Sequence, residues 1–557
     1  MKEIRNRNWN WKMGIRKGRK GERKGSLSPF LEEGTRMDGP MCPSARSVLR
    51  STISASLFCL LALLLTPLVA TAQPASNEFD TYHAFRDSLD AAMAAGEVDA
   101  FWQGLKDAGQ VPFVIGDSVA FLYRGSANIV AWNGDFNGWG NNVTVPGTGT
   151  RLGSSDLWML EMTFPSDARL DYKIVLNGNN WILDPNNPLQ QWSGFGPNSE
   201  LRMPDYVYPE ETIPRTDIAH GTLAEPVTIS SANLGYDVNY LVYTPAGYDT
   251  LSNLPTLYVT DGHEYADDRL GSMLIVLDNL IADGLIEPIL TIFVDPREPG
   301  NAGNNRRQSQ YADDYASFAA FLAEELVPTI DAAYRTNPSP DERGLLGTSL
   351  GGLFSGYLGA SRSDVFRCIA IHSPAFSYDM QRNQDHIYQL YTEANRLPLQ
   401  IFMSTGVIHD TEDGARRMRD LFEEKGYPLH YIEVNEGHSW GNWRGLLDEP
   451  LIHCWGTDTT LGLDEETPAS DGLTVNSYPN PSSGDATIVF DLPAPQRISL
   501  DIYNLLGRRI DTLLDETSLA AGPHAIDVTA SDWPSGWYVF RLQSEKQQAT
   551  GQMLLIR

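Results

Sequence analysis

The sequence predicts a multidomain protein in which a doubly wound α/β sheet follows one all-β domain and precedes another. The middle of the chain alternates short apolar runs with helical patterns, which is typical of parallel strands joined by crossover helices. The segments on either side consist of short strand-like runs separated by Asn, Gly and Pro clusters. A G-x-S-x-G pattern at residues 347–351 joins a strand-like run to a helical one inside the middle region.

The chain is long and acidic. Its 557 residues exceed the usual size of one domain, and its formal net charge is −29. Residues 1–72 carry 13 Lys and Arg against 5 Asp and Glu, so the remainder holds 29 against 66, a net charge of −37. The lysines of that remainder are Lys106, Lys173, Lys425 and Lys546. Such a surface repels nucleic acid and anionic membranes, which argues against both as partners.

Residues 1–72 are predicted to be a leader, with a secretory signal peptide at 47–72. Two arginines precede an apolar run centred on residues 57–65, which ends in a small-residue A-T-A site. The run is too short for a membrane span, so we expect none after processing. The basic segment before it indicates a later translation start, at Met37 or Met41.

The cysteines do not predict a disulfide framework. Cys59 lies inside the signal without a preceding glycine, so we expect no lipid anchor. After cleavage only Cys368 and Cys454 remain, and whether they pair is left open. Cys368 stands in an apolar run that indicates a buried strand.

Residues 73–110 are predicted to form a short helical pair that leads into the first domain. Four apolar side chains share one stripe at helical spacing. They are Phe79, Tyr82, Phe85 and Leu89. We expect this segment to be structural.

Residues 111–205 predict a small β-sandwich. Strand-like runs at 127–132 and 170–176 are separated by Asn, Gly and Pro clusters. The pattern G-D-F-N-G-W at 134–139, followed by Y-K, N-G and D-P pairs, resembles the early-set, glycogen-binding-type module found before amylolytic domains.

That resemblance implies a sugar platform. In glucan-binding members the positions matching Trp139, Lys173 and Trp181 form it, and all three residue types are present here. Aromatic faces suit sugar C–H surfaces, and a lysine can donate to hydroxyls. The alternative is that these side chains are sandwich core and that the module only positions the next domain.

Residues 226–456 predict the doubly wound sheet. The expected strands are Tyr240–Tyr243, Thr256–Val259, Ile289–Val294, Leu345–Leu346, Cys368–Ile371, Leu399–Met403 and His430–Val434. The expected helices include Tyr315–Tyr334, Leu350–Ala360 and Asp413–Lys425. The serine of the G-x-S-x-G pattern lies between the central strand and its helix, where such sheets place their sites.

Ser349 is the predicted nucleophile. A tight strand-to-helix turn pushes its hydroxyl above the sheet, and the flanking glycines avoid a clash in that turn. Serine needs a base oriented by an acid, in the chain order Ser, acid, His. His438 follows the last strand and is the predicted base. Asp410 is the predicted acid. The alternatives are Asp413 and a Ser–His pair without a strong acid.

An oxyanion hole needs two backbone N–H donors. The helix N-terminus behind the serine offers that of Leu350. The loop after the early strand Thr256–Val259 offers that of His263. We predict these two groups as the donors.

The residues of this domain resemble the α/β-hydrolase family that includes enterochelin esterase, feruloyl esterases and esterase D. The resemblance also rests on the motifs D-P-R at 295–297, N-R-R at 305–307 and E-L-V-P at 325–328. Members often place the acid three residues after the glycine of the acid loop. Here that position is His409 and Asp410 follows, which leaves the identity of the acid open.

Residues 472–557, after a predicted linker at 457–471, form the second all-β domain. Its motifs are Y-P-N-P at 478–481, Y-N-L-L-G-R-R at 503–509 and P-S-G-W-Y at 534–538. Together with the closing residues they resemble a type IX secretion sorting domain. The resemblance implies an immunoglobulin-like fold, an interaction with the type IX secretion machinery, and export to the surface of a Bacteroidetes-like bacterium.

These features predict an exported serine esterase that acts on carboxylic esters, such as acetyl or feruloyl groups on polysaccharide. The alternatives are a siderophore trilactone esterase, an acyltransferase, and a carbohydrate-binding surface protein with an inert hydrolase domain. No metal-ligand cluster or phosphate-cradling loop stands out in the sequence, so we expect no cofactor. The oligomeric state is left open.

Overall fold

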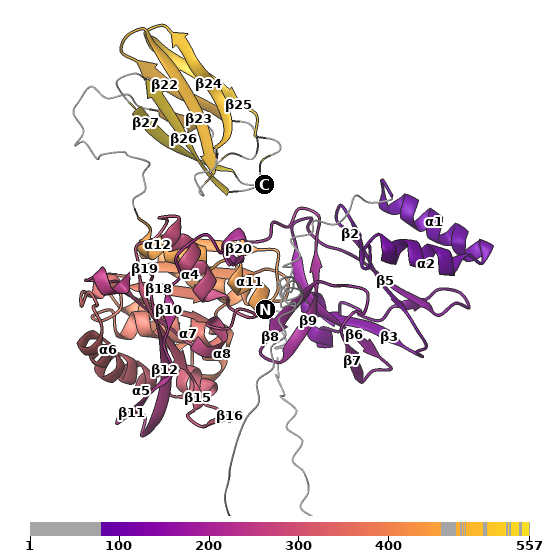
Figure 1. Ribbon diagram of the computed structural model, residues 1–557, viewed down its shortest axis with the longest axis horizontal. Coiled ribbons are helices and arrows are strands. Elements are labelled where there is room, and N and C mark those ends of the chain that lie inside the picture. The colour runs from indigo at the N-terminus through magenta and orange to yellow at the C-terminus, as the bar shows by residue number, and fades with distance from the viewer. Residues whose placement is uncertain are drawn as a thin grey trace, which may run out of the picture. The chain divides into compact units, whose positions relative to one another are not determined.

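The computed structural model describes residues 79–457 and most of 475–555, and Figure 1 gives the order of the elements along the chain. The gaps in the second range are 479–481, 483, 485, 505–508, 531–532, 534–535 and 545–547. The predicted signal peptide, Cys59 and all of the predicted linker beyond Thr457 lie outside the described residues.

The described chain opens with helices α1 (Tyr82–Ala95) and α2 (Val98–Asp107). Thr81 caps α1 by accepting a hydrogen bond from the backbone N–H of Ala84 at 3.0 Å, and a left-handed glycine follows its end. The ring of Phe85 is buried and stacks on Phe113 with centroids 4.0 Å apart. The helical pair therefore packs onto the β-domain that follows.

Residues 113–202 form two antiparallel sheets around one core. The first has the order β1 (Phe113–Ile115), β2 (Ser118–Arg124), β5 (Leu157–Thr163), β4 (Thr150–Arg151). The second has the order β3 (Val130–Gly134), β6 (Arg169–Leu176), β9 (Gly196–Arg202), β8 (Gln190–Ser193), with β7 (Asn180–Ile182) paired to β6. Phe121 of the first sheet contacts Trp132 and Tyr172 of the second, so the facing sheets share a buried aromatic core.

The largest sheet has nine strands. Its order is β10 (Thr222–Leu223), β12 (Tyr236–Thr244), β14 (Leu290–Asp295), β13 (Thr256–Val259), β17 (Arg343–Thr348), β18 (Cys368–His372), β19 (Gln400–Gly406), β20 (Leu429–Val434), with β11 (Val227–Ser231) paired to β12. The six strands from β14 to β20 run parallel, so their carboxyl ends meet along one edge. A small hairpin, β15 (Arg297–Glu298) and β16 (Asn301–Asn305), follows β14.

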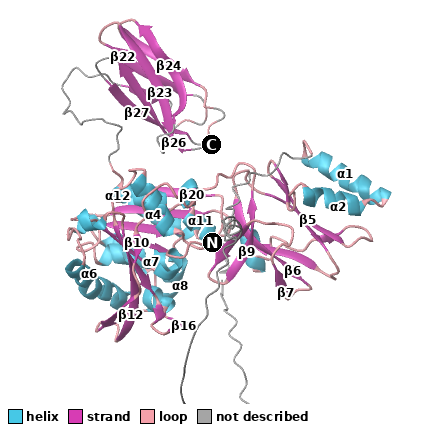
Figure 2. Ribbon diagram, in the orientation of Figure 1, coloured by secondary structure: helices cyan, strands magenta, loops and turns pink. Residues whose placement is uncertain are grey.

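Helices cover both faces of this sheet (Figure 2). They are α3 (Gly262–Tyr265), α4 (Met273–Ala282), α5 (Tyr315–Ala320), α6 (Val327–Ala333), α7 (Leu350–Ser361), α8 (Phe376–Arg382), α9 (His386–Glu393), α10 (Glu412–Glu424), α11 (Trp440–Arg444) and α12 (Asp448–Trp455). Helices α5, α6, α7, α9 and α10 share a core with Tyr258 of β13, whereas α4, α11 and α12 share another with its neighbours Leu257 and Val259. Alternate residues of one buried strand thus face opposite layers, as a doubly wound sheet requires.

The helix predicted over Tyr315–Tyr334 is interrupted. A π-helical turn at Phe321–Leu326 separates α5 from α6. Pro328 stands in the first turn of α6 and has no backbone N–H to give to the preceding turn. The predicted helical stretch is therefore present, and its α-helical hydrogen bonding changes to a π-helical turn in the middle.

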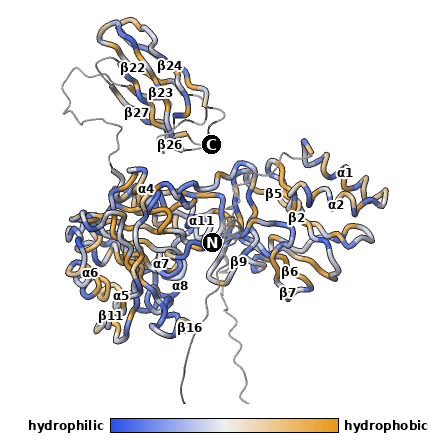
Figure 3. The backbone as a smooth tube through the Cα atoms, in the orientation of Figure 1, coloured by the Kyte–Doolittle hydropathy of each residue, from blue (hydrophilic) through white to orange (hydrophobic). Residues whose placement is uncertain are grey.

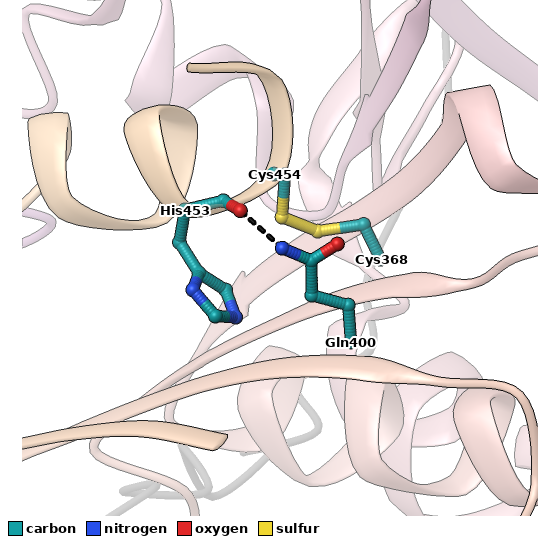
Figure 4. The surroundings of a disulfide bond; sticks show 4 residues. All are labelled: Cys368, Gln400, His453 and Cys454. Carbon is teal, nitrogen blue, oxygen red and sulfur yellow. Dashed lines mark hydrogen bonds between the residues drawn. A yellow bond between two sulfur atoms is a disulfide. The ribbon is translucent and has the colours of Figure 1, made fainter. Parts of the chain in front are cut away.

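A disulfide joins Cys368 of β18 to Cys454 of α12, with Cα atoms 6.0 Å apart (Figure 4). The sequence left this pairing open. Beside it, the side chain of Gln400 donates to the carbonyl oxygen of His453. The two links fasten the last helix of the domain to the middle of the sheet.

Removing the disulfide should lower the stability of the α/β domain. The bridge closes a sequence separation of 86 residues, for which chain entropy predicts about 3 to 5 kcal/mol and a Tm roughly 10 °C lower. The decrease in Tm is measured by thermal unfolding of a Cys368→Ala/Cys454→Ala variant, followed by tryptophan fluorescence. Wild-type protein held in reductant should match the variant. A Tm within about 2 °C of the oxidised wild type would show that the bridge constrains nothing.

The C-terminal strands form two further sheets around a core of their own. One has the order β21 (Val475–Tyr478), β22 (Ala486–Leu492), β25 (Gly522–Val528). The other has the order β24 (Arg509–Leu519), β23 (Gln496–Asn504), β26 (Gly536–Ser544), β27 (Gln548–Leu555). Figure 3 colours apolar stretches orange along these strands as in the other domains. Among the described residues, no helix is both long and apolar enough to cross a membrane.

Candidate active site

Ser349 occupies a sharp turn between β17 and α7. Its φ of 59° and ψ of −114° lie where non-glycine residues are rarely found. A Cβ on Gly347 would lie 2.4 Å from the carbonyl oxygen of Gly351, and one on Gly351 would lie 2.4 Å from the Thr260 hydroxyl. Both flanking glycines are therefore required by close packing, as the nucleophile-elbow pattern predicts.

His438 lies beside Ser349 in the loop after β20. Its Nε2 is 2.9 Å from the Ser349 hydroxyl oxygen, and its Nδ1 is 2.5 Å from a carboxylate oxygen of Asp410. Trp443 of α11 packs edge-on against the imidazole, with centroids 4.9 Å apart. The three predicted residues thus form one line of hydrogen bonds across the carboxyl edge of the sheet.

Asp410 is held at both oxygens. One bonds to His438, and the other accepts from the backbone N–H of Gly406 at 2.6 Å and from the Ser373 hydroxyl at 2.5 Å. The side chain is fully buried. The alternative acid, Asp413, lies in the first turn of α10 instead. The structure therefore brings Asp410, rather than Asp413, to the histidine.

Ser373 and Trp443 support this carboxylate, and the sequence did not identify them. The indole N–H of Trp443 donates to the Ser373 hydroxyl at 2.9 Å, which leaves the hydroxyl hydrogen for Asp410. Ser373 directly follows β18 and has a positive φ of 39°. Its position directly after a central parallel strand could have marked Ser373 as a residue near the site.

The predicted oxyanion donors lie at the same edge of the sheet. Leu350 is the first residue of α7, directly after Ser349. His263 belongs to the short helix α3, which follows β13, the strand hydrogen-bonded to β17. Burial lowers the pKa of the His263 side chain, whose Nδ1 is 3.4 Å from a carboxylate oxygen of Asp295.

An ion pair between a buried aspartate and a half-buried arginine connects the loop after β13 to the turn at Ser349. Asp261 is almost fully buried and accepts from Nε of Arg307 at 2.8 Å. The same guanidinium donates to the carbonyl oxygen of Thr348, the residue before Ser349, at 3.1 Å. Arg307 belongs to the N-R-R motif of the sequence, to which no role was assigned. The pair fixes the two backbone segments from which the predicted oxyanion donors come.

This arrangement suits nucleophilic attack. With the carboxylate of Asp410 at Nδ1, that nitrogen carries the hydrogen, and Nε2 is left to accept the proton of Ser349. A neutral imidazole so placed converts a weakly nucleophilic hydroxyl into a stronger one. The geometry is therefore compatible with activation of the Ser349 hydroxyl by His438.

Two of the three predicted sugar-platform residues lie on one face of the same sheet. Lys173 on β6 pairs with Asn133, and Trp181 on β7 pairs with Val175, so the two share one face of their sheet. Trp181 is 45% exposed. Trp139 lies instead in the 3₁₀ turn Asp135–Gly140, where its indole N–H donates to Asp135 at 3.2 Å.

Two family models match the chain. Residues 231–454 match the family described as "Putative esterase", and residues 476–557 match the secretion system C-terminal sorting domain. The first match spans the nine-stranded sheet from the end of β11 to α12, and with it Ser349, Asp410 and His438. The second spans the C-terminal sheets.

Two related sequences match part of this chain. The uncharacterized protein YjcH of Bacillus subtilis is 26% identical over 240 residues, which is 42% of this chain and 97% of that protein. An endo-1,4-beta-xylanase/feruloyl esterase of Xylanibacter ruminicola is 29% identical over 160 residues, which is 27% of this chain and 21% of that protein.

Among solved structures, the enterobactin esterase of Shigella flexneri, crystallised with enterobactin, has a TM-score of 0.51 at 19% identity. The match covers 61% of this chain and 92% of that one, so it extends beyond the segment of the esterase model. The ferric enterobactin esterase of Salmonella typhimurium gives the same TM-score and identity, over 61% of this chain and 93% of that one. At this identity the likeness shows a shared fold. Residues 231–454 thus resemble the esterase family, and residues 476–557 resemble the secretion system C-terminal sorting domain.

Proposed function

We propose that this chain is an exported serine esterase that hydrolyses carboxylic esters through an acyl-enzyme. The observation that carries the proposal is the line of hydrogen bonds from Ser349 through His438 to Asp410. The esterase family of residues 231–454 supports hydrolysis of carboxylic esters, and the sorting domain implies secretion or attachment at the cell surface.

In the proposed mechanism, the hydroxyl oxygen of Ser349 attacks the ester carbonyl while Nε2 of His438 takes its proton. The backbone N–H groups of Leu350 and His263 stabilise the oxyanion that develops. His438 then gives its proton to the leaving alcohol, and the acyl group stays on Ser349. A water molecule, deprotonated by His438, attacks the acyl-enzyme and releases the acid. These steps need no cofactor.

The substrate class proposed is an acetyl or feruloyl group carried by a polysaccharide or oligosaccharide. Three observations support it. Residues 476–557 match the sorting-domain model, which implies export. The β-domain before the esterase has Trp181 and Lys173 on one outer face, and the name of one relative includes both a xylanase and a feruloyl esterase. Sugar binding by Trp139, Lys173 and Trp181 is part of this proposal.

A second candidate substrate is a siderophore trilactone. It is favoured by the likeness to enterobactin esterases, which reaches beyond the esterase segment of this chain. Acyl transfer to a sugar uses the same covalent intermediate with a different acceptor. It would yield an acylated sugar where hydrolysis yields the free acid.

The substrate proposal is tested with the full chain on acetylated and feruloylated xylan, beside enterobactin at matched ester concentration. We expect release of acetate or ferulate at least about tenfold faster than trilactone opening, since binding differences between such acyl groups are worth a factor of that order. The products of a reaction containing a xylo-oligosaccharide acceptor distinguish free acid from transferred acyl groups. Faster opening of the trilactone would overturn the polysaccharide assignment.

A further inference from the structure

Arg169 lies on strand β6 of the β-domain at residues 113–202 and is fully buried. Within its own domain it donates through Nη2 to Asp171 at 2.5 Å and through Nε to Glu200 at 2.8 Å. Burial by itself would raise the pKa of Glu200, but Arg169 and Arg202 outweigh it and lower that pKa to about 2. A buried arginine held this firmly has a fixed position.

The third arm of the same guanidinium reaches the loop that carries His438. Nη1 donates to the Ser439 hydroxyl at 3.0 Å and lies 3.6 Å from a carboxylate oxygen of Glu436. The backbone N–H of Arg169 also donates to the carbonyl oxygen of Asn435 at 3.2 Å. One residue of the β-domain therefore contacts this loop on both sides of the histidine.

The loop of His438 and the helix α11 that follows it each approach the β-domain too closely for a side chain at one position. A Cβ on Gly437 would lie 2.3 Å from Cβ of Asp135, and one on Gly441 would lie 2.0 Å from Cζ of Arg169. At both glycines, side chains of the β-domain occupy the space that a larger residue's side chain would need. The contact is therefore close-packed one residue before His438 and three residues after it.

The loop that carries the acid is supported from the same domain. Asn142 lies 2.9 Å from Nε2 of His409, the residue before Asp410. Ile408 packs against the core of the β-sandwich, and its backbone N–H donates to the carbonyl oxygen of Glu436 at 3.1 Å. The acid and histidine loops are thus joined to each other and to the β-domain.

We infer that Arg169 is a positioning residue for His438, and that the β-domain holds the two loops of the catalytic acid and base in register with Ser349. The inference rests on the proposed function and adds a role for the β-domain that does not depend on sugar binding. Ser349 is positioned by its own strand and helix. His438 and Asp410 lie on loops that residues of the β-domain contact through hydrogen bonds. Misplacement of such groups by about 1 Å can cost a hundredfold in rate.

The test measures how fast Ser349 is phosphorylated by diethyl p-nitrophenyl phosphate, a small reagent that needs the base but no sugar or acyl subsite. In the full chain, Ser439→Ala removes one hydrogen-bond acceptor of Arg169. Arg169→Lys keeps the positive charge but loses the planar set of N–H donors that reaches several partners at once. We expect labelling to slow about tenfold or more in both variants. With a p-nitrophenyl ester as substrate, kcat should fall by the same factor and KM should change little.

The matched control is Tyr172→Phe. It lies on the same strand, is equally buried, and loses a hydrogen bond to Asp184 at 2.9 Å, but it faces the sandwich core. We expect it to lower the Tm while Ser349 is labelled at the wild-type rate. Labelling at the wild-type rate in folded Ser439→Ala or Arg169→Lys protein would overturn the inference, as would equal slowing in Tyr172→Phe. A wild-type protein whose Ser349 is not labelled would instead overturn the proposed function.

Discussion

Replacing Ser349 by alanine should reduce ester hydrolysis by at least about a thousandfold, and His438→Ala should do the same. The reason is that no covalent intermediate forms without the hydroxyl, and the hydroxyl is a poor nucleophile without Nε2 at 2.9 Å. Because the two residues act as a unit, the double variant should lose hardly more than either single one. The measurement is kcat/KM for p-nitrophenyl acetate.

The matched control for the serine is Ser355→Ala. Ser355 is a buried serine of α7 whose hydroxyl donates to the carbonyl oxygen of Gly351 at 3.0 Å. Its replacement should leave kcat/KM within about twofold, since it removes one neutral hydrogen bond away from the nucleophile's hydroxyl. Activity that survives Ser349→Ala would place the nucleophile elsewhere and would remove the basis of the proposed mechanism.

Replacing Asp410 by asparagine should cost about three to four decades in kcat, whereas Asp413→Asn should change it less than about twofold. The expected loss follows from the donors at the second oxygen of Asp410, the Gly406 N–H and the Ser373 hydroxyl. An asparagine would present its carbonyl oxygen to these donors and its NH₂ group to Nδ1 of His438. The imidazole would then carry its hydrogen on Nε2 and could not take the proton of Ser349.

This prediction separates the two acids that the sequence left open. A large loss in Asp413→Asn with a small one in Asp410→Asn would contradict the geometry. A Ser373→Ala variant tests the tautomer argument further. With the Ser373 donor removed, we expect kcat to fall about tenfold rather than by three decades, because the Gly406 N–H still fixes the carboxylate of Asp410.

Patterns that are local in the sequence were predictable. The elbow is a run of adjacent residues whose spacing dictates the turn, and each predicted strand of the nine-stranded sheet lies within or overlaps an observed one. The order Ser, acid, His is the one expected of α/β-hydrolases, and the predicted strands then indicated the loops in which the acid and the histidine should stand. The secretion sorting domain carried motifs close together along the chain, and its family model matches.

Contacts between distant segments were not predictable. Trp443 reaches Ser373 across 70 residues, Cys454 reaches Cys368 across 86, and Arg169 reaches Ser439 across 270. No spacing rule links such positions, because each depends on how separate layers pack. The acid was ambiguous for the same reason: only the folded loop decides which carboxylate points at the histidine.

Other inferences from the sequence remain predictions. The oxyanion donors Leu350 and His263 follow from the position of their backbone, and the domain boundaries follow from changes in composition. The sugar platform was inferred from residue types that occur in a whole family of modules. Residue type does not decide whether a face binds sugar, and the turn that holds Trp139 was not visible in the spacing.

The most direct test of the mechanism is the mass of the acyl-enzyme. Full-length protein is mixed with excess p-nitrophenyl acetate, quenched in acid within its first turnovers, digested and examined by peptide mass spectrometry. The mechanism predicts an acetyl group on Ser349 in the wild type and none at that position in His438→Ala. An acetyl group on another residue, or rapid hydrolysis with Ser349 never modified, would contradict it.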